Sequence, residues 1–293
     1  MAQSILPGRW TDQQVPERDQ IFLDHVGYFI GDLDRAATTL RRLGFSPSAI
    51  WQQQNVGADG TVQPSGNSNR LVRLRRGFLE FLASTSDTPL SEQLRKALVR
   101  YEGLHLIAFS HADLQAQRAR LVKCGFDMQS MVRLRGRTKD EVSWSILRTL
   151  PHVMPEGRIQ FVYPHTPELS WPPGSTEHPN HADSLTGVMV CVRERDEAKD
   201  RFGAYLGRDA DSDGLTTDRG RVHIVGPEDA RDVLPDFLPP SLPYIAAVTV
   251  MTTDLDETRR VIRNNGIVPL AQRDGILWIS PTDALGCYLG FHE

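Results

Sequence analysis

Cysteine is scarce in this chain of 293 residues, and the few cysteines are poorly placed for structural chemistry. There are three, Cys124, Cys191 and Cys287, which are odd in number, far apart and without a C-x-x-C pair. Their number and spacing argue against a disulfide scaffold and exclude a zinc cluster built on paired thiolates. We therefore expect a cytoplasmic protein.

Several other features are missing. No run of ~18 apolar residues is present to cross a bilayer, and the N-terminus lacks the basic and apolar regions of a signal peptide. With 33 basic and 37 acidic residues the formal charge is −4, so the sequence predicts neither a nucleic-acid nor a membrane partner. The fingerprints G-x-G-x-x-G, G-x-x-x-x-G-K-[ST] and G-x-S-x-G are also absent, which gives no reason to expect NAD, ATP or a nucleophilic serine elbow.

What is present is an internal repeat. An apolar run, an Asp-Leu pair, an amphipathic stretch and a glycine recur from Leu23 to Phe45, from Leu104 to Phe126 and from Ile245 to Ile267, with a degraded copy from Thr186 to Gly207. In the first three the aspartate precedes the glycine by twelve residues. This spacing predicts a strand, a helix capped by Asp32, Asp113 or Asp254, and a left-handed glycine after the helix.

Short strand-like runs follow each predicted helix, most clearly in the first two copies. The sequence thus predicts an α+β protein of four β-α-β-β-β modules. We expect an N-terminal arm (1–20), an N-terminal domain of two modules (21–168), a Pro-rich crossing segment (169–184) and a C-terminal domain of two degenerate modules (185–293). A polar loop, 55–69, interrupts the first copy, and such loops often border binding clefts.

Four such modules resemble the vicinal oxygen chelate superfamily, which includes glyoxalase I, extradiol dioxygenases and bleomycin-binding proteins. The runs LDHVGYF, NRLVRLRRGFLEFLA and HPN are most similar to the glyoxalase-like domain family. The resemblance implies that two modules curl around a cleft, and that first and last strands supply up to four ligands of a divalent Zn, Ni, Mn or Fe ion. It also implies that a homodimer is possible.

Two residues of the first module match those ligand positions. His25 lies on a largely apolar strand face and Glu80 lies within FLEFLA, where a buried ionised side chain needs a partner. Each has a plain alternative: His25 as a core histidine with one hydrogen bond, and Glu80 as the partner of Arg73 or Arg75. We expect the pair to bind a metal or substrate, with Glu80 as the catalytic carboxylate.

The second module matches less well. Alignment on the helix-terminating glycines places Gln160 opposite Glu80, and Leu106 rather than His105 opposite His25. His105 reaches the cleft only if a bulge absorbs one residue. Gln160 and His105 therefore complete the expected ligand set, with the alternative that His105 is a core or surface residue.

The C-terminal modules lack ligands. Val188, Ala247 and Leu289 occupy the corresponding positions, and His292 and Glu293 fall in a tail that we expect to fray. We therefore expect this half to be structural, without the 2-His-1-carboxylate set of ring-cleaving dioxygenases.

Substrate contacts are expected from Asn69 and Arg70, at a loop-to-strand junction, and from His178 and Asn180 in the HPN segment, the alternative for HPN being a surface turn. Arginines at 73, 75, 133 and 135 form either solvated strand exteriors or an anion clamp, and Trp51 and Trp144 fit a core better than a pocket. We expect a metal-dependent isomerase or lyase acting on a small oxygenated metabolite. The alternatives are a metal-free binding protein and an extradiol-type dioxygenase.

Overall fold

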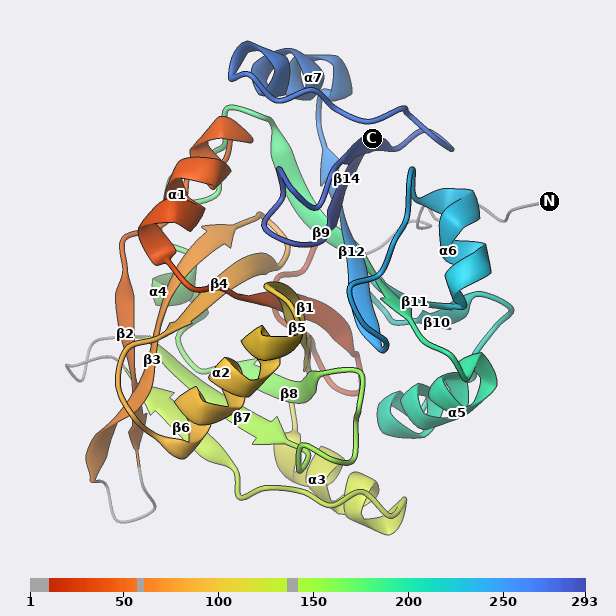
Figure 1. Ribbon diagram of the computed structural model, residues 1–293. Helices are drawn as coiled ribbons and strands as arrows, with labels where there is room; N and C mark the ends of the chain where they lie inside the picture. Colours follow the sequence, from red (N-terminus) through yellow and green to blue (C-terminus); the bar gives the residue numbers. More distant parts are fainter. Residues whose placement is uncertain (1–10, 57–60, 136–141) are drawn as a thin grey trace.

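A computed structural model describes residues 11–56, 61–135 and 142–293. Figure 1 shows a barrel made by the first half of the chain beside a sheet made by the second half. The predicted arm 1–20 lies outside the described residues as far as residue 10.

The barrel is built from two modules of the predicted β-α-β-β-β type. The first comprises β1 (Phe22–Phe29), α1 (Leu33–Arg42), β2 (Trp51–Val56), β3 (Val62–Arg73) and β4 (Phe78–Ser84). The second comprises β5 (Gly103–Ser110), α3 (Leu114–Lys123), β6 (Val132–Arg135), β7 (Ser143–Arg148) and β8 (Arg158–Pro164), and α2 (Pro89–Arg100) joins the two. The strands close in the order β1-β4-β3-β2-β6-β7-β8-β5, with the modules meeting at the antiparallel pairs β1–β5 and β2–β6.

The second half follows a short helix, α4 (Pro167–Ser170), and forms an open six-stranded sheet. Its elements are β9 (Ala182–Cys191), α5 (Arg195–Leu206), β10 (Gly214–Thr216), β11 (Arg221–Val225), α6 (Pro227–Val233), β12 (Tyr244–Thr252), α7 (Leu255–Asn264), β13 (Leu277–Ile279) and β14 (Tyr288–His292). The strand order is β10-β11-β9-β12-β14-β13. Two strands follow α5 and two follow α7, one fewer than the predicted unit, so this sheet does not close.

Helix boundaries agree with the repeat. The side chains of Asp32, Asp113 and Asp254 cap α1, α3 and α7 by accepting backbone N–H groups. Gly44, Gly125 and Gly266 then adopt positive φ angles of 83°, 85° and 77°, the conformation that ends a helix at low cost in glycine. The predicted caps and glycines are confirmed.

The predicted polar loop 55–69 is wrong for most of its length. Residues up to Val56 belong to β2 and residues from Val62 belong to β3, which pair as an antiparallel hairpin. Polar residues occur along β3 because the barrel interior accepts them: Asn67 and Asn69 are both only 2 % exposed.

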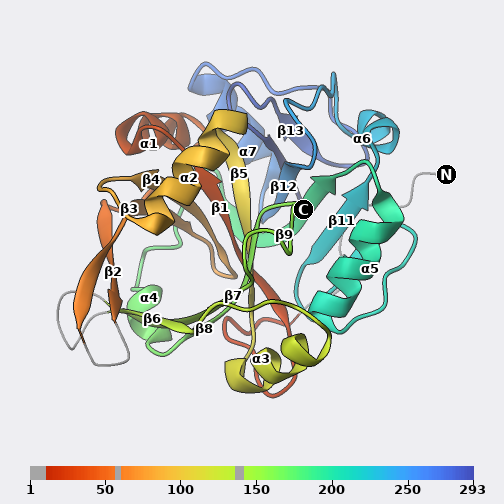
Figure 2. The ribbon, with the colours of Figure 1, turned by 60° about the horizontal axis from the view of Figure 1, so that its bottom comes forward.

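The two halves share one hydrophobic core. Outward residues of the barrel, such as Tyr28 and Phe109, cluster with Val188 and Val248 of the C-terminal sheet. In Figures 1 and 2, β1 and β5 lie between the rest of the barrel and that sheet. The described part of the chain has no helix that is long and apolar enough to cross a membrane.

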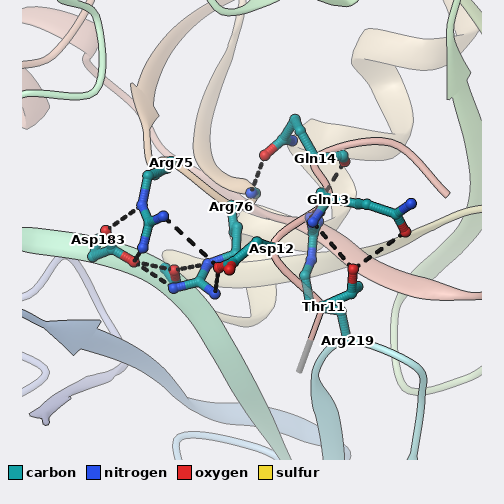
Figure 3. Close-up of polar contacts among 10 residues, drawn as sticks. Thr11, Asp12, Gln13, Gln14, Arg75, Arg76, Asp183 and Arg219 are labelled. Atoms are coloured by element: carbon teal, nitrogen blue, oxygen red, sulfur yellow. Dashed lines mark hydrogen bonds and ion pairs between the residues drawn. The ribbon is translucent and has the colours of Figure 1, made fainter. Parts of the chain in front are cut away.

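Polar contacts tie the arm to this domain boundary (Figure 3). Arg76 contacts Asp12 and Asp183 at 2.8 Å each, and Arg75 contacts Asp183 at 2.7 Å. The fully buried Arg219 donates to the carbonyl of Gln13 at 2.7 Å. Burial is the largest single effect on the Asp183 carboxyl and raises its pKa. The hydrogen bonds from Arg75, Ser184 and Arg76 together outweigh burial, so the pKa is lowered.

Candidate functional site

The barrel interior contains a cavity of about 380 Å³, a size typical of small-molecule sites. Its wall is largely apolar, with polar groups at a few points. The lining residues that matter here are His25, Gln53, Asn69, Phe78, Glu80, Leu106, Trp144, Arg148, Arg158, Gln160 and Trp171.

The strand register places the expected site residues of the two modules at a similar depth in the barrel. His25 of β1 pairs with Ala108 of β5, which pairs with Gln160 of β8. Glu80 of β4 pairs with Gly27, two residues beyond His25. Because alternate residues of a strand share a face, all three polar side chains reach the interior.

His25 is oriented by its neighbour Asp24. Nδ1 of His25 lies 2.7 Å from Oδ1 of Asp24, and both residues are buried. Since a carboxylate only accepts, Nδ1 carries the hydrogen, and on a neutral ring Nε2 presents its lone pair. Nε2 lies 3.8 Å from Oε2 of Glu80, and the ring stacks on Phe78 at 4.2 Å between centroids.

Glu80 is held by two amides from neighbouring strands. Its Oε1 accepts from Nδ2 of Asn69 at 2.6 Å and from Nε2 of Gln53 at 3.0 Å. Neither Arg73 nor Arg75 pairs with it: Arg73 donates to the carbonyl of Ser170, and Arg75 binds Asp183. Oε2 of Glu80 is thereby left on the side of His25, where it is able to act on a bound molecule.

The second module supplies different chemistry at equivalent places. Leu106 pairs with Gly27 and corresponds to His25, and Gln160 corresponds to Glu80, as the sequence alignment predicted. Arg158 pairs with Leu106, and Arg148 pairs with Gln160. One half of the cavity thus carries an imidazole and a carboxylate, and the other half carries two guanidinium groups.

These arginines are unusual in their surroundings. Arg148 is 8 % exposed and its Nε donates to Oε1 of Gln160 at 3.0 Å. The guanidinium carbon of Arg158 lies 4.9 Å from the ring centre of Phe29. Burial lowers the pKa of Arg148 to about 10 and that of Arg158 to about 9, against the attraction of Glu80.

His105, the fourth expected metal ligand, lies away from the cavity wall. Its Nε2 contacts the carbonyl oxygen of Tyr101 at 2.9 Å, and its ring stacks on Tyr101 at 4.0 Å and on Phe29 at 5.2 Å. The reason is strand alternation, because Leu106 takes the inward position. Burial lowers the pKa of His105 to about 4.

The expected substrate contacts separate. Asn69 lines the cavity, whereas Arg70 donates to the carbonyl of Ser48 and binds Asp34 outside it. Asn180 is fully buried and donates to the carbonyl of Leu43. Nδ1 of His178 accepts the backbone N–H of Ser46, and its Nε2 contacts the carbonyl oxygen of Arg73. The HPN segment therefore fastens the crossing segment to the end of α1, and Arg70, His178 and Asn180 are not among the residues lining the cavity.

The C-terminal half behaves mostly as expected. Val188, Ala247 and Leu289 are buried apolar residues. The expectation that His292 frays is wrong, however. His292 lies in β14 and is 2 % exposed, and its Nε2 contacts Oγ1 of Thr186 at 2.8 Å.

A metal fits this cavity poorly. Of the expected donors, His25 and Glu80 alone are shown to approach one another, and the Gln160 oxygen already accepts from Arg148. The positive charges of Arg148 and Arg158 at the cavity wall also disfavour a cation nearby. No group of three or more His, Cys, Asp or Glu side chains within residues 11–56, 61–135 and 142–293 is arranged to hold a metal.

Sequence reasoning missed several residues of this site, among them Arg148, Arg158 and Trp171. Arg148 shares a strand face with Trp144 and Ile146, and Arg158 precedes Gln160 by two residues, so alternation could have found both. Trp171 lines the cavity from the crossing segment. The only sequence signal for this role was its position next to the Pro-rich stretch. Trp144, expected in the core, belongs both to the barrel's apolar cluster and to the cavity wall, and Trp51 lines the cavity too.

This architecture is similar to that of solved structures of other proteins. A structure titled as a hypothetical protein from Staphylococcus aureus is similar at a TM-score of 0.62 and 13 % identity, covering 93 % of this chain and 98 % of that one. A variant of 4-hydroxymandelate synthase from Streptomyces coelicolor is similar at a TM-score of 0.59 and 14 % identity, covering 93 % and 92 %. At these identities the likeness establishes the fold alone. No curated protein matches the sequence.

The family model described as a glyoxalase-like domain matches residues 23–206. That match covers the whole barrel, the crossing segment and the first strand and helix of the C-terminal sheet. Together with the paired modules and the full-length fold matches, it shows that the chain belongs to the glyoxalase-like domain family of the vicinal oxygen chelate superfamily.

Proposed function

We propose that the barrel cavity is the active site of a glyoxalase-like isomerase or lyase in which Asp24, His25 and Glu80 move a proton on a small oxygenated molecule. The observation that supports this most directly is the placing of Nε2 of His25 and Oε2 of Glu80 3.8 Å apart at one cavity wall. Two groups that exchange protons and face one bound molecule meet the geometric requirement for general acid–base catalysis.

The roles follow from the hydrogen bonds. Asp24 fixes the Nδ1–H tautomer of His25, so Nε2 takes or returns the proton. Asn69 and Gln53 hold Glu80 by one oxygen, while the other oxygen faces the imidazole. Burial in an apolar cavity strengthens these hydrogen bonds, because the local dielectric constant is low.

The test is hydrogen exchange at carbon. Mandelate and phenylpyruvate, incubated with the protein in D₂O, should lose the proton signal next to the carbonyl or carboxyl group faster than in buffer alone. Glu80→Gln should slow the catalysed exchange by about 10²-fold or more, whereas the matched change Glu92→Gln, at an exposed position on α2, should not. A protein that binds these compounds without exchange would favour the second candidate, a metal-free binding protein.

The family relationship also suggests a metal-dependent form, which the cavity supports less well because His25 and Glu80 are the only expected donors shown to approach one another within the described residues. Elemental analysis of protein purified without chelator, followed by titration with Zn, Ni, Mn and Fe, tests it. Stoichiometric metal that is lost in His25→Gln would support this form. Exchange activity that survives complete chelation would exclude it.

A further inference from the structure

Resting on the proposed function of the same cavity, we propose that its ligand is an organic anion, a carboxylate carried on an apolar aromatic body, held by Arg148 and Arg158. The arginines lie on β7 and β8 of the second module, whereas His25 and Glu80 lie on β1 and β4 of the first module. They would fix the acid group and present the rest of the molecule to the proton-transferring pair.

Neither of the two positive charges has a carboxylate partner in the described part of the chain. Among the described residues, no Asp or Glu oxygen lies within ion-pair distance of either guanidinium, and Glu80 acts on both only through space. The hydrogen bond of Arg148 to Gln160 is to a neutral amide. A buried charge is costly unless it is paired, so the buried Arg148 and the partly buried Arg158, both without a carboxylate partner, indicate that the partner arrives with the ligand.

The charges that line the cavity also favour an anion. Of the described residues, Arg73, Arg148 and Arg158 line it together with one carboxylate, that of Glu80, so the wall carries an excess of positive charge that an anionic ligand offsets. A guanidinium presents a planar fork of N–H donors that matches a carboxylate. A phosphate monoester, as a dianion, would be repelled by Glu80 more strongly than a carboxylate.

The aromatic side chains of the cavity indicate the body of the ligand. Phe78, Trp144 and Trp171 line the cavity and contact one another, with ring centroids 5.8–5.9 Å apart. Such a surface favours a flat apolar group by ring-edge and stacking contacts. The volume of about 380 Å³ suits a molecule of the size of a substituted aromatic acid.

Two further polar atoms at this site point to oxygen atoms on the ligand. Nε1 of Trp171 and Oδ1 of Asn69 are buried without a hydrogen-bond partner among the described residues, and both residues line the cavity. An indole N–H donates and an amide oxygen accepts, so a ligand hydroxyl would satisfy both. A carboxylate with a neighbouring hydroxyl is the class that uses all these groups.

The test is titration calorimetry with benzoate, mandelate, benzamide and phenyl phosphate as probes. Benzoate and mandelate should bind, benzamide should bind at least tenfold more weakly, and phenyl phosphate should bind more weakly than benzoate. Arg158→Met and Arg148→Met should each weaken mandelate binding at least tenfold, with Arg158→Lys intermediate. The matched control Arg95→Met, on the outer helix α2, should bind like the parent protein.

Equal binding of benzoate and benzamide would overturn the proposal, as would unchanged mandelate affinity in a folded Arg158→Met protein. Tighter binding of phenyl phosphate would replace the carboxylate by a phosphate ligand. Glu80→Gln separates this inference from the proposed reaction: it should abolish exchange while retaining mandelate binding. Mandelate binding without any exchange would therefore refute the proposed reaction but not the anion site. Exchange on neutral substrates would refute the anion site but not the reaction.

Discussion

Asp24 and His25 are neighbours in the chain, and their side chains nevertheless meet, with Oδ1 of Asp24 2.7 Å from Nδ1 of His25. In a regular strand adjacent side chains point to opposite faces. The pairing of β1 with β5 is irregular between Leu23 and His25, and a bulge of this kind redirects a side chain. The buried carboxylate thus orients the imidazole from outside the cavity.

Asp24→Asn should reduce the exchange activity by about 10²-fold or more while leaving mandelate affinity within about twofold. An asparagine amide can donate to Nδ1, which would move the hydrogen to Nε2 and remove the lone pair from the cavity. Exchange rates and calorimetry on the same preparation measure the two effects. Activity equal to that of the parent would show that Asp24 does not set the tautomer.

Arg158→Met should raise the free energy of unfolding, by on the order of 1 kcal/mol, even as it weakens ligand binding. The guanidinium has no carboxylate within ion-pair distance in the described part of the chain, so its burial is a cost that an apolar side chain of similar length avoids. Urea denaturation without ligand provides the measurement. A loss of more than about 1 kcal/mol would mean that Arg158 serves the fold rather than the ligand.

His105 should make the fold sensitive to acid. Its pKa is lowered to about 4, below the unfolded value of about 6.5, so the unfolded chain binds more protons between these values. Stability is therefore lost as pH falls below 6.5, by about 2 kcal/mol at pH 5 from this residue alone. His105→Phe should reduce the difference in unfolding free energy between pH 7 and pH 5 by that amount. His152→Gln, at an exposed position, should leave it unchanged, and an equal reduction in both variants would refute the assignment.

Arg219→Met should lower the free energy of unfolding by about 3 kcal/mol, because it breaks a buried charged contact between the halves. Arg219 donates to the carbonyls of Gln13 and Leu23, and its charge lies near enough to Asp24 for attraction. Arg208→Met removes a partly exposed pair with Asp218 and should cost less than 1 kcal/mol. Similar costs for the two would mean that the buried contacts of Arg219 add nothing.

The repeat predicts much of the secondary structure and the strand register before any tertiary contact is considered. Aspartate caps, left-handed glycines and strand alternation are local effects of the backbone, so they fix the modules and place His25, Glu80, Leu106 and Gln160 in register from sequence alone. The pairing of β1 with β5 is irregular at His105, between Leu106 and Leu104, yet Leu106 keeps the inward position and His105 stays outside the cavity lining.

Other properties depend on which strands become neighbours. Closure of the barrel brings the arginines of β7 and β8 to the cavity that holds the histidine and carboxylate of β1 and β4, and no local pattern encodes that meeting. The crossing segment contributes Trp171 because it packs against the barrel, and the HPN residues are used as fasteners for the same reason. Sequence alone determined the repeating unit, because hydrogen bonding and periodicity act over a few residues, whereas the tertiary structure decided the charge of the cavity, because charges far apart in the chain meet only when the barrel closes.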